Sequence, residues 1–183
     1  HGGSWTMIEV ITFPRSGHHW LMRGIEQRCE LAPGWHCDIH KEQPTENTLV
    51  IKTHDFELNH IPRHPYVVQI RQNVLHALQS WFDLYVHDRL CEDSQAAWDH
   101  FAGWAVDFAG AWYAKWTKGD DLIIYESLLS HGRLAYIEDI AHRLGLRCTG
   151  AIQKEIHSPR TSAFRHKVDA QKMQDRFMKI YTQ

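Results

Sequence analysis

The chain has 183 residues, of which 43% are hydrophobic, which is enough for one core and not for two, so we expect a single domain over residues 5–183. Its 20 Lys and Arg against 22 Asp and Glu give a formal charge of -2, which excludes a broadly basic surface for nucleic acid and requires any anion site to be local. The sequence contains no apolar run of about 18 residues and no leader-like segment, so we expect no membrane span and no signal peptide.

Short β-branched runs alternate with amphipathic stretches along the chain. Residues 1–4 have the character of an expression-tag remnant and are left out of the fold. Residues 8–13 are predicted as a strand, which a tight loop joins to a helix over residues 19–29. The later elements are predicted as strands over 49–51, 66–70 and 122–125 and as helices over 74–85, 94–116, 133–144 and 169–181.

This alternation predicts an α/β fold with three layers, in which helices flank a central parallel sheet. Trp98, Trp104 and Trp112 recur at helical spacing and are predicted to lie in the helix core. In open parallel sheets, ligands bind beyond the carboxyl ends of the strands. The loops that follow the first three predicted strands are therefore the expected place of the functional site.

The segment from Pro14 to His19 joins the first predicted strand to the first helix. This arrangement aims backbone N–H groups and the positive end of the helix at one point, which is a P-loop-like anion site. The segment lacks the Gly-Lys-Ser/Thr ending of nucleotide-triphosphatase loops, so its residues by themselves indicate only a generic phosphate cradle. Lys52 and His54 follow the second strand and, two residues apart, project from the same face. A neutral imidazole there can accept a proton at pH 7.

Several motifs occur in the order found in the sulfotransferase family. The stretch Thr12–Leu21, which contains Pro-Arg-Ser-Gly, resembles the 5′-phosphosulfate loop of that family, and Lys52-Thr53-His54 is similar to the segment that supplies its catalytic histidine. The other matching segments are Val67–Arg71 with Ser80 in the following helix, Leu122–Leu128, and Phe164–Lys167. By this resemblance the chain is similar to the cytosolic sulfotransferases that use 3′-phosphoadenosine 5′-phosphosulfate (PAPS).

The resemblance implies transfer of a sulfuryl group from PAPS to a hydroxyl or amine, without a metal and with adenosine 3′,5′-bisphosphate (PAP) as product. It makes His54 the general base and makes Lys52 and Arg15 the cations that stabilise charge on the reacting oxygens. The implied nucleotide-binding residues are Arg15, Ser16, Gly17, His18, His19, Trp20, Arg71, Ser80, Tyr125, Arg165 and Lys167. The implied partner is a small-molecule or glycan acceptor, with neither nucleic acid nor membrane.

The chain also departs from the family pattern. His18 and His19 stand where the family has two threonines, so backbone N–H groups or imidazole donors must hold the 5′-phosphate. Nine positions instead of eight separate Arg71 from Ser80, which makes Gln79 an alternative for the 3′-phosphate contact. Two other functions stay open: a nucleotide-binding module that has lost catalysis, and a nucleotide kinase-like phosphotransferase, against which the missing Gly-Lys-Ser/Thr counts.

Neither a metal site nor a disulfide framework is predicted. His36 and His40 have a spacing that could bind zinc on a helix, but Pro33-Gly34 favours a loop and no second pair of ligands lies nearby. The four cysteines form no Cys-X-X-Cys pair, which favours free thiols in a reducing, cytoplasmic compartment.

Overall fold

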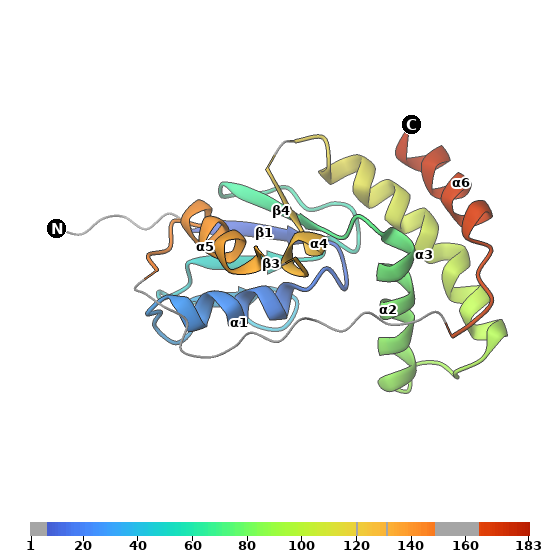
Figure 1. The fold of residues 1–183 in the computed structure, drawn as a ribbon, viewed down its shortest axis with the longest axis horizontal. Helices are drawn as coiled ribbons and strands as arrows, with labels where there is room; N and C mark the ends of the chain where they lie inside the picture. Colours follow the sequence, from blue (N-terminus) through green and yellow to red (C-terminus); the bar gives the residue numbers. More distant parts are fainter. Residues whose placement is uncertain (1–6, 120, 131, 149–164) are drawn as a thin grey trace. The chain divides into compact units, whose positions relative to one another are not determined.

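A computed structural model describes residues 7–119, 121–130, 132–148 and 165–183 (Figure 1). The chain divides into two compact units, the first made of residues 1–70 and 121–159 and the second of residues 71–120 and 160–183. The prediction of a single domain stays a prediction. Residues 1–4, interpreted as a tag remnant, and Phe164 of the last motif lie outside the described residues.

The first unit is built on a five-stranded, all-parallel sheet with the strand order β2-β3-β1-β4-β5. The strands are β1 (Ile8–Thr12), β2 (His36–Asp38), β3 (Val50–Thr53), β4 (Tyr66–Ile70) and β5 (Leu122–Ile124). Because β1 is central, four of its five residues are buried, including the carboxylate-bearing Glu9. The predicted α/β fold with a parallel sheet is confirmed at this level, whereas β2 was not predicted.

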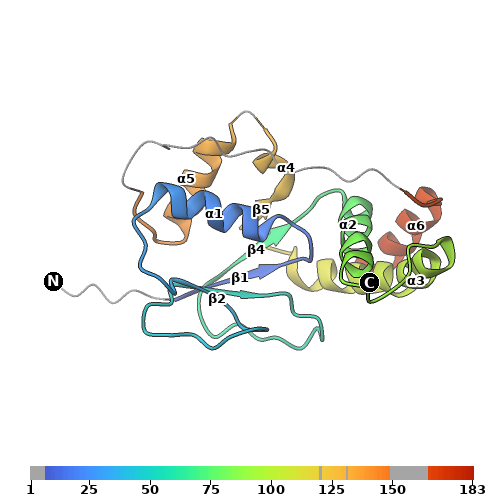
Figure 2. The ribbon, with the colours of Figure 1, turned by 90° about the horizontal axis from the view of Figure 1, so that it is seen from below.

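The helices of the first unit are α1 (His18–Arg28), α4 (Tyr125–Leu128) and α5 (Arg133–Arg143). Figure 2 shows α1 and α5 on the same side of the strands. Their apolar faces meet alternate strand residues in one core that includes Val10, Leu21, Ile25, Val67, Ile123 and Ile140. Tyr125, predicted as the last residue of a strand, instead begins α4, so the strand ends one residue earlier.

The second unit is helical and consists of α2 (Val74–His87), α3 (Gln95–Trp116) and α6 (Ala170–Tyr181). Each helix begins after a residue whose side chain accepts a hydrogen bond from the first turn: Asn73, Ser94 and Asp169. α3 packs against both α2 and α6. In the described part of the chain, no helix combines the length and the apolar character that crossing a membrane requires.

The tryptophans of α3 only partly follow the prediction that they form the helix core. Trp98 and Trp112 are buried, with 1% and 0% of their surface exposed. The prediction is wrong for Trp104, which is 40% exposed and meets the ring of Trp81 edge to face at a centroid distance of 5.4 Å. Trp81 is 4% exposed, so of this pair only Trp104 has much of its surface in contact with water.

Candidate functional site

The loop between β1 and α1 has a backbone that demands glycine at one position. Gly17 has a φ of 77°, and a Cβ atom built on it would lie 2.7 Å from Cδ2 of Tyr125, so a side chain is excluded by conformation and by space. Arg15, which is exposed, also adopts a left-handed φ of 64°. These two turns reverse the chain between the end of β1 and the start of α1.

The amino end of α1 faces this loop without a capping side chain. The helical ladder begins with the hydrogen bond from the N–H of Leu21 to the carbonyl of Gly17, and no acidic residue lies in the first turn. Ser16 is 1% exposed, and its hydroxyl oxygen has no hydrogen-bond partner among the described residues. A buried hydroxyl without a partner is unusual, as is a helix start that lacks both a cap and an acid.

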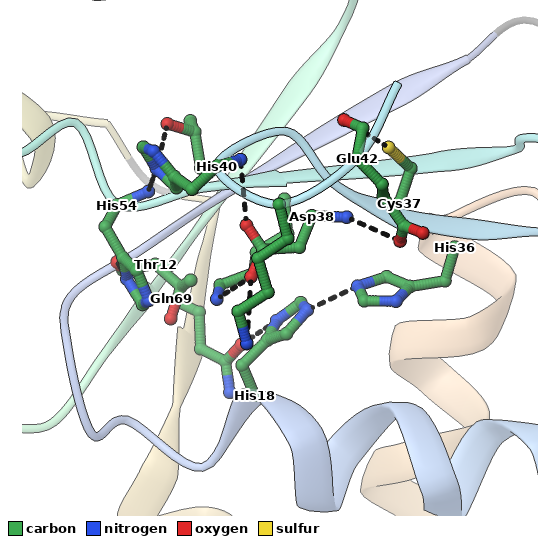
Figure 3. Close-up of polar contacts among 12 residues, drawn as sticks. Thr12, His18, His36, Cys37, Asp38, His40, Glu42, His54 and Gln69 are labelled. Carbon is green, nitrogen blue, oxygen red and sulfur yellow. Dashed lines mark hydrogen bonds and ion pairs between the residues drawn. The ribbon is translucent and has the colours of Figure 1, made fainter. Parts of the chain in front are cut away.

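His54 follows β3 and is held through one ring nitrogen (Figure 3). Its Nδ1 lies 2.7 Å from the carbonyl oxygen of Thr12, which can only accept, so Nδ1 carries the proton and Nε2 carries the lone pair. Burial, aided by the charge of Lys52, lowers the pKa of His54 to about 3. His54 is therefore neutral at pH 7, with its basic nitrogen identified by the geometry.

A second histidine fixes the backbone at the same strand end. Nε2 of His40 accepts the backbone N–H of His54 at 2.9 Å and lies 3.2 Å from Oγ1 of Thr53. The rings of His40 and His54 stack with 13° between their planes. The main chain and the ring of His54 are thus both held.

Lys52 forms a buried ion pair. Its Nζ lies 2.7 Å from Oδ2 of Asp38, and the two side chains are only 4% and 7% exposed. Burial lowers the pKa of Lys52 although Asp38 opposes the shift. For Asp38, burial would by itself raise the pKa, but the hydrogen bond and charge of Lys52 outweigh it, so the pKa is lowered. Asp38 also accepts the backbone N–H of His40 at 3.1 Å.

His18 belongs to a chain of hydrogen bonds whose direction can be deduced. Nε2 of Gln69 donates to the carbonyl of Ser16 at 2.8 Å, so its Oε1 accepts from Nδ1 of His18 at 3.1 Å. Nε2 of His18 is then the acceptor for Nε2–H of His36, at 2.7 Å (Figure 3). Burial and the neighbouring His36 hold the pKa of His18 well below its usual value. Because both ring nitrogens bind protein groups, His18 offers an anion its backbone N–H only.

The two aromatic residues implied in nucleotide binding lie in different surroundings. Tyr125 is 4% exposed, with its ring directly beside Gly17. Trp20 is partly buried and packs against the core between the sheet and α1. Its expected stacking on adenine stays a prediction.

Residues assigned to the 3′-phosphate belong to the second unit. Arg71 is 4% exposed, and its carbonyl accepts the hydroxyl of Tyr113 at 2.5 Å. Ser80 is 8% exposed and Gln79 is fully buried. Nε2 of Gln79 donates to Asp83 at 3.0 Å, while its Oε1 has no hydrogen-bond partner among the described residues. These contacts do not decide between Ser80 and Gln79 as the residue that would contact the 3′-phosphate.

Arg165 makes two ion pairs within the second unit. Its guanidinium binds Oδ1 of Asp83 at 2.7 Å and Oδ2 of Asp93 at 2.8 Å, and the hydrogen bond to Asp83 raises the pKa of Arg165. Two carboxylates at one guanidinium oppose an incoming phosphate. Lys167 is exposed, and its main chain exchanges hydrogen bonds with the side chain of Gln95.

A cavity of about 720 Å³ lies elsewhere in the first unit. Its wall includes Ile39, Ile51, His60 and Glu9, and none of the residues named above as site residues. Glu9 is 3% exposed; its Oε2 binds Nε2 of His60 at 2.6 Å, and its Oε1 accepts the backbone N–H of Arg63 at 2.7 Å. These contacts hold the loop before β4 onto the start of β1.

Four participants of the site were not identified as site residues from the sequence: His36, Asp38, His40 and Gln69. His36 and Asp38 lie in β2, which is too short to show a periodic pattern, and Gln69 lies in the segment Val67–Arg71, in which the resemblance gives a role to Arg71 only. In the described ranges, no group of three or more His, Cys, Asp or Glu side chains is placed to hold a metal ion. Comparison of the chain with models of protein families, with curated proteins and with solved structures gives no significant match.

Proposed function

We propose that this chain is a sulfotransferase that moves a sulfuryl group from PAPS to a hydroxyl or amine of a small-molecule or glycan acceptor. The observation that carries the proposal is the tautomer of His54. Its Nδ1–H donates to the carbonyl of Thr12 at the end of β1, which leaves Nε2 as the basic nitrogen. This contact places the ring of His54 beside the start of the loop that contains Arg15 and Gly17. A general base placed next to an anion-binding loop is the arrangement that sulfuryl transfer requires.

The loop fits the 5′-phosphosulfate part of the donor. The hydroxyl of Ser16 is buried without a partner among the described residues, and the amino end of α1 has no cap, while the side of Gly17 that a Cβ would occupy is filled by the ring of Tyr125. An anion at this position would be bound by backbone N–H groups and the positive end of the helix. In this proposal the loop is the P-loop-like phosphate cradle, and Arg15 adds a positive charge at its rim.

When bound, PAPS supplies an activated sulfuryl group; the residues of the chain do the rest. Nε2 of His54 accepts the proton of the acceptor hydroxyl while that oxygen bonds to sulfur and the bond from sulfur to the phosphate oxygen breaks. Arg15 and Lys52 stabilise the charge that appears on the leaving oxygen. Lys52 keeps one N–H donor on Asp38 and can turn the other two toward the substrate.

One observation favours a second candidate, a module that binds nucleotide without turnover. Lys52 is paired with Asp38, so one of the two cations that the proposed mechanism uses already has a carboxylate partner; within the second unit, Arg165 is likewise paired with Asp83 and Asp93. In a catalytic site, Lys52 would have to bind the donor as well as Asp38. The proposal includes a reducing, cytoplasmic location, because the four cysteines form no Cys-X-X-Cys pair.

Ligand-induced thermal shifts distinguish the candidates first. PAP is expected to raise the Tm in the presence of a chelator, because ligand that binds only the folded state stabilises it. ATP with magnesium and AMP are expected to have little effect. A preference for ATP with magnesium would indicate a kinase-like phosphotransferase, and no response to PAP would refute the proposal.

Turnover with radiolabelled PAPS on an acceptor panel then separates enzyme from binder. His54→Ala should keep the PAP-induced shift and lose turnover by about 10²–10⁴-fold, the usual contribution of a general base. The matched control is His87→Ala, which removes a histidine that is 84% exposed. If the parent protein binds PAP but transfers no label to any acceptor, or if His54→Ala is as active as the parent, the catalytic role of His54 is wrong.

A further inference from the structure

Two cysteines far apart in the sequence lie in contact in the first unit. Sγ of Cys29 and Sγ of Cys148 are 3.0 Å apart, although 119 positions separate them in the chain. Cys29 is the C-cap residue that directly follows α1, and Cys148 follows the end of α5. The sulfur atoms of a disulfide lie about 2.05 Å apart, so a movement of about 1 Å would bring these two to bonding distance.

Both thiols are held on packed structure. Cys29 is 5% exposed and part of the core between α1 and α5, and Cys148 packs against the same core from its edge. The backbone N–H of Cys29 donates to Ile25 at 2.9 Å. Beside it, Arg28 forms an ion pair with Glu138 of α5. The carboxyl end of α1 is therefore held to α5 by more than the sulfur contact.

We propose that Cys29 and Cys148 are a redox-active dithiol pair, which forms an intramolecular disulfide by exchange with a small-molecule disulfide such as oxidised glutathione. This inference does not depend on the proposed sulfotransferase activity. The disulfide would join the carboxyl end of α1 to the chain that follows α5. It is a modification site formed by two elements that no sequence spacing relates.

The two thiols have different parts in the exchange. Cys148 is only partly buried, so it attacks the small disulfide first, forms a mixed disulfide and releases one small thiol. Cys29 then loses its proton, attacks Sγ of Cys148 and releases the second small thiol. In total, two protein thiols are oxidised to one disulfide and one small disulfide is reduced to two thiols, which carry away the two protons.

The second step is expected to be slow at neutral pH. In the reduced pair, burial, together with the neighbouring Cys148, raises the pKa of Cys29 to about 12. In the mixed disulfide the thiol of Cys148 is gone, but burial, the larger cause, still raises the pKa of Cys29, so its thiolate is scarce at pH 7. Since the thiolate is the attacking species, closure of the mixed disulfide should accelerate roughly tenfold for each pH unit from 7 to 9. This dependence distinguishes a buried resolving thiol from an exposed one.

The test uses the full chain in glutathione buffers of increasing oxidised fraction. Two of the four thiols should disappear, the mass should fall by about 2 Da, and peptide mapping without reductant should find the peptides of Cys29 and Cys148 joined. The disulfide closes a loop of more than 100 residues, so the Tm should rise by roughly 10 °C and return to its original value with dithiothreitol.

Matched variants complete the test. Cys148→Ser should lose the cross-linked peptide and the gain in Tm, whereas Cys91→Ser, which removes another partly buried thiol, should keep both. The proposal is overturned if no peptide joins Cys29 to Cys148 at any glutathione ratio. It is also overturned if a glutathione adduct persists on Cys148 without being resolved at pH 9.

Discussion

Replacement of Asp38 by alanine would leave the charge of Lys52 buried without its counterion. The Lys52 side chain is 4% exposed and its Nζ lies 2.7 Å from the carboxylate, so water cannot readily replace Asp38. Removal of one partner from a buried ion pair costs about 3–5 kcal/mol, which exceeds the cost of most surface changes. For a chain of this length we expect the Tm to fall by roughly 10 °C.

The assay is urea denaturation followed by circular dichroism, with the midpoint and slope compared between variants. The control is Lys41→Ala: the Lys41 side chain is 69% exposed and its Nζ lies 4.0 Å from Asp38, so its loss should cost at most about 1 kcal/mol. Asp38→Asn should fall between the two, because it keeps an acceptor for the backbone N–H of His40.

Proton linkage gives a second readout. Without Asp38, burial should lower the pKa of Lys52 further below its unfolded value of about 10.4. Where the unfolded state binds more protons, stability rises with pH. The defect of Asp38→Ala should therefore shrink as pH rises from 7 toward 10. A loss no larger than that of Lys41→Ala, or a loss that does not change with pH, would refute the buried ion pair.

Three further predictions follow from the described contacts. Gly17→Ala should destabilise the protein by roughly 1–3 kcal/mol and abolish the PAP-induced Tm shift, since its Cβ would meet the ring of Tyr125; an unchanged shift would show that the loop does not bind the nucleotide. His54 has a pKa of about 3, below its unfolded value of about 6.5, so its contribution to stability is present above pH 6.5 and is lost as pH falls toward 3. The NMR resonance of the His54 ring should accordingly not titrate between pH 5 and 8, and a midpoint near 6.5 would contradict this environment. Gly110→Ala should lower the Tm by crowding α6, because its Cβ would lie 2.8 Å from Cβ of Ile180. Gly103→Ala in the same helix would meet nothing within 4 Å and should raise the Tm slightly.

The local elements were predicted where the sequence pattern and burial agree. The strand over residues 66–70 has the predicted bounds, and α3 differs from its prediction by one residue at its start. The error at Tyr125 has a physical reason: an aromatic residue after three aliphatic ones suits a strand, but its ring packs on Gly17 as the chain turns into a helix. The strand β2 was missed because three residues are too few for a period.

The site residues, too, were predicted only where the signal lies within a few neighbouring residues. The tight loop after the first strand and the place of His54 at a strand end are local properties, and the sequence pattern predicted both; the need for glycine at position 17 was not predicted, because it depends partly on the ring of Tyr125. The partner of Lys52 was not predictable, because β2 is separated from β3 by a loop and their pairing depends on the whole sheet. In the sheet, Asp38 and Lys52 occupy partner positions on neighbouring strands, which brings their side chains together on one face.

The amino-acid sequence by itself determined the longer strands and helices and which residue types follow the strand ends, since period, propensity and turn chemistry act within a few residues. Only the tertiary structure decided which polar groups meet. The order β2-β3-β1-β4 places Asp38 beside Lys52, Thr12 beside His54, and Gln69 beside Ser16. The contact between Cys29 and Cys148 likewise exists only because α1 and α5 pack on the same face of the sheet, an arrangement that follows from burial of their apolar sides and not from any spacing in the chain.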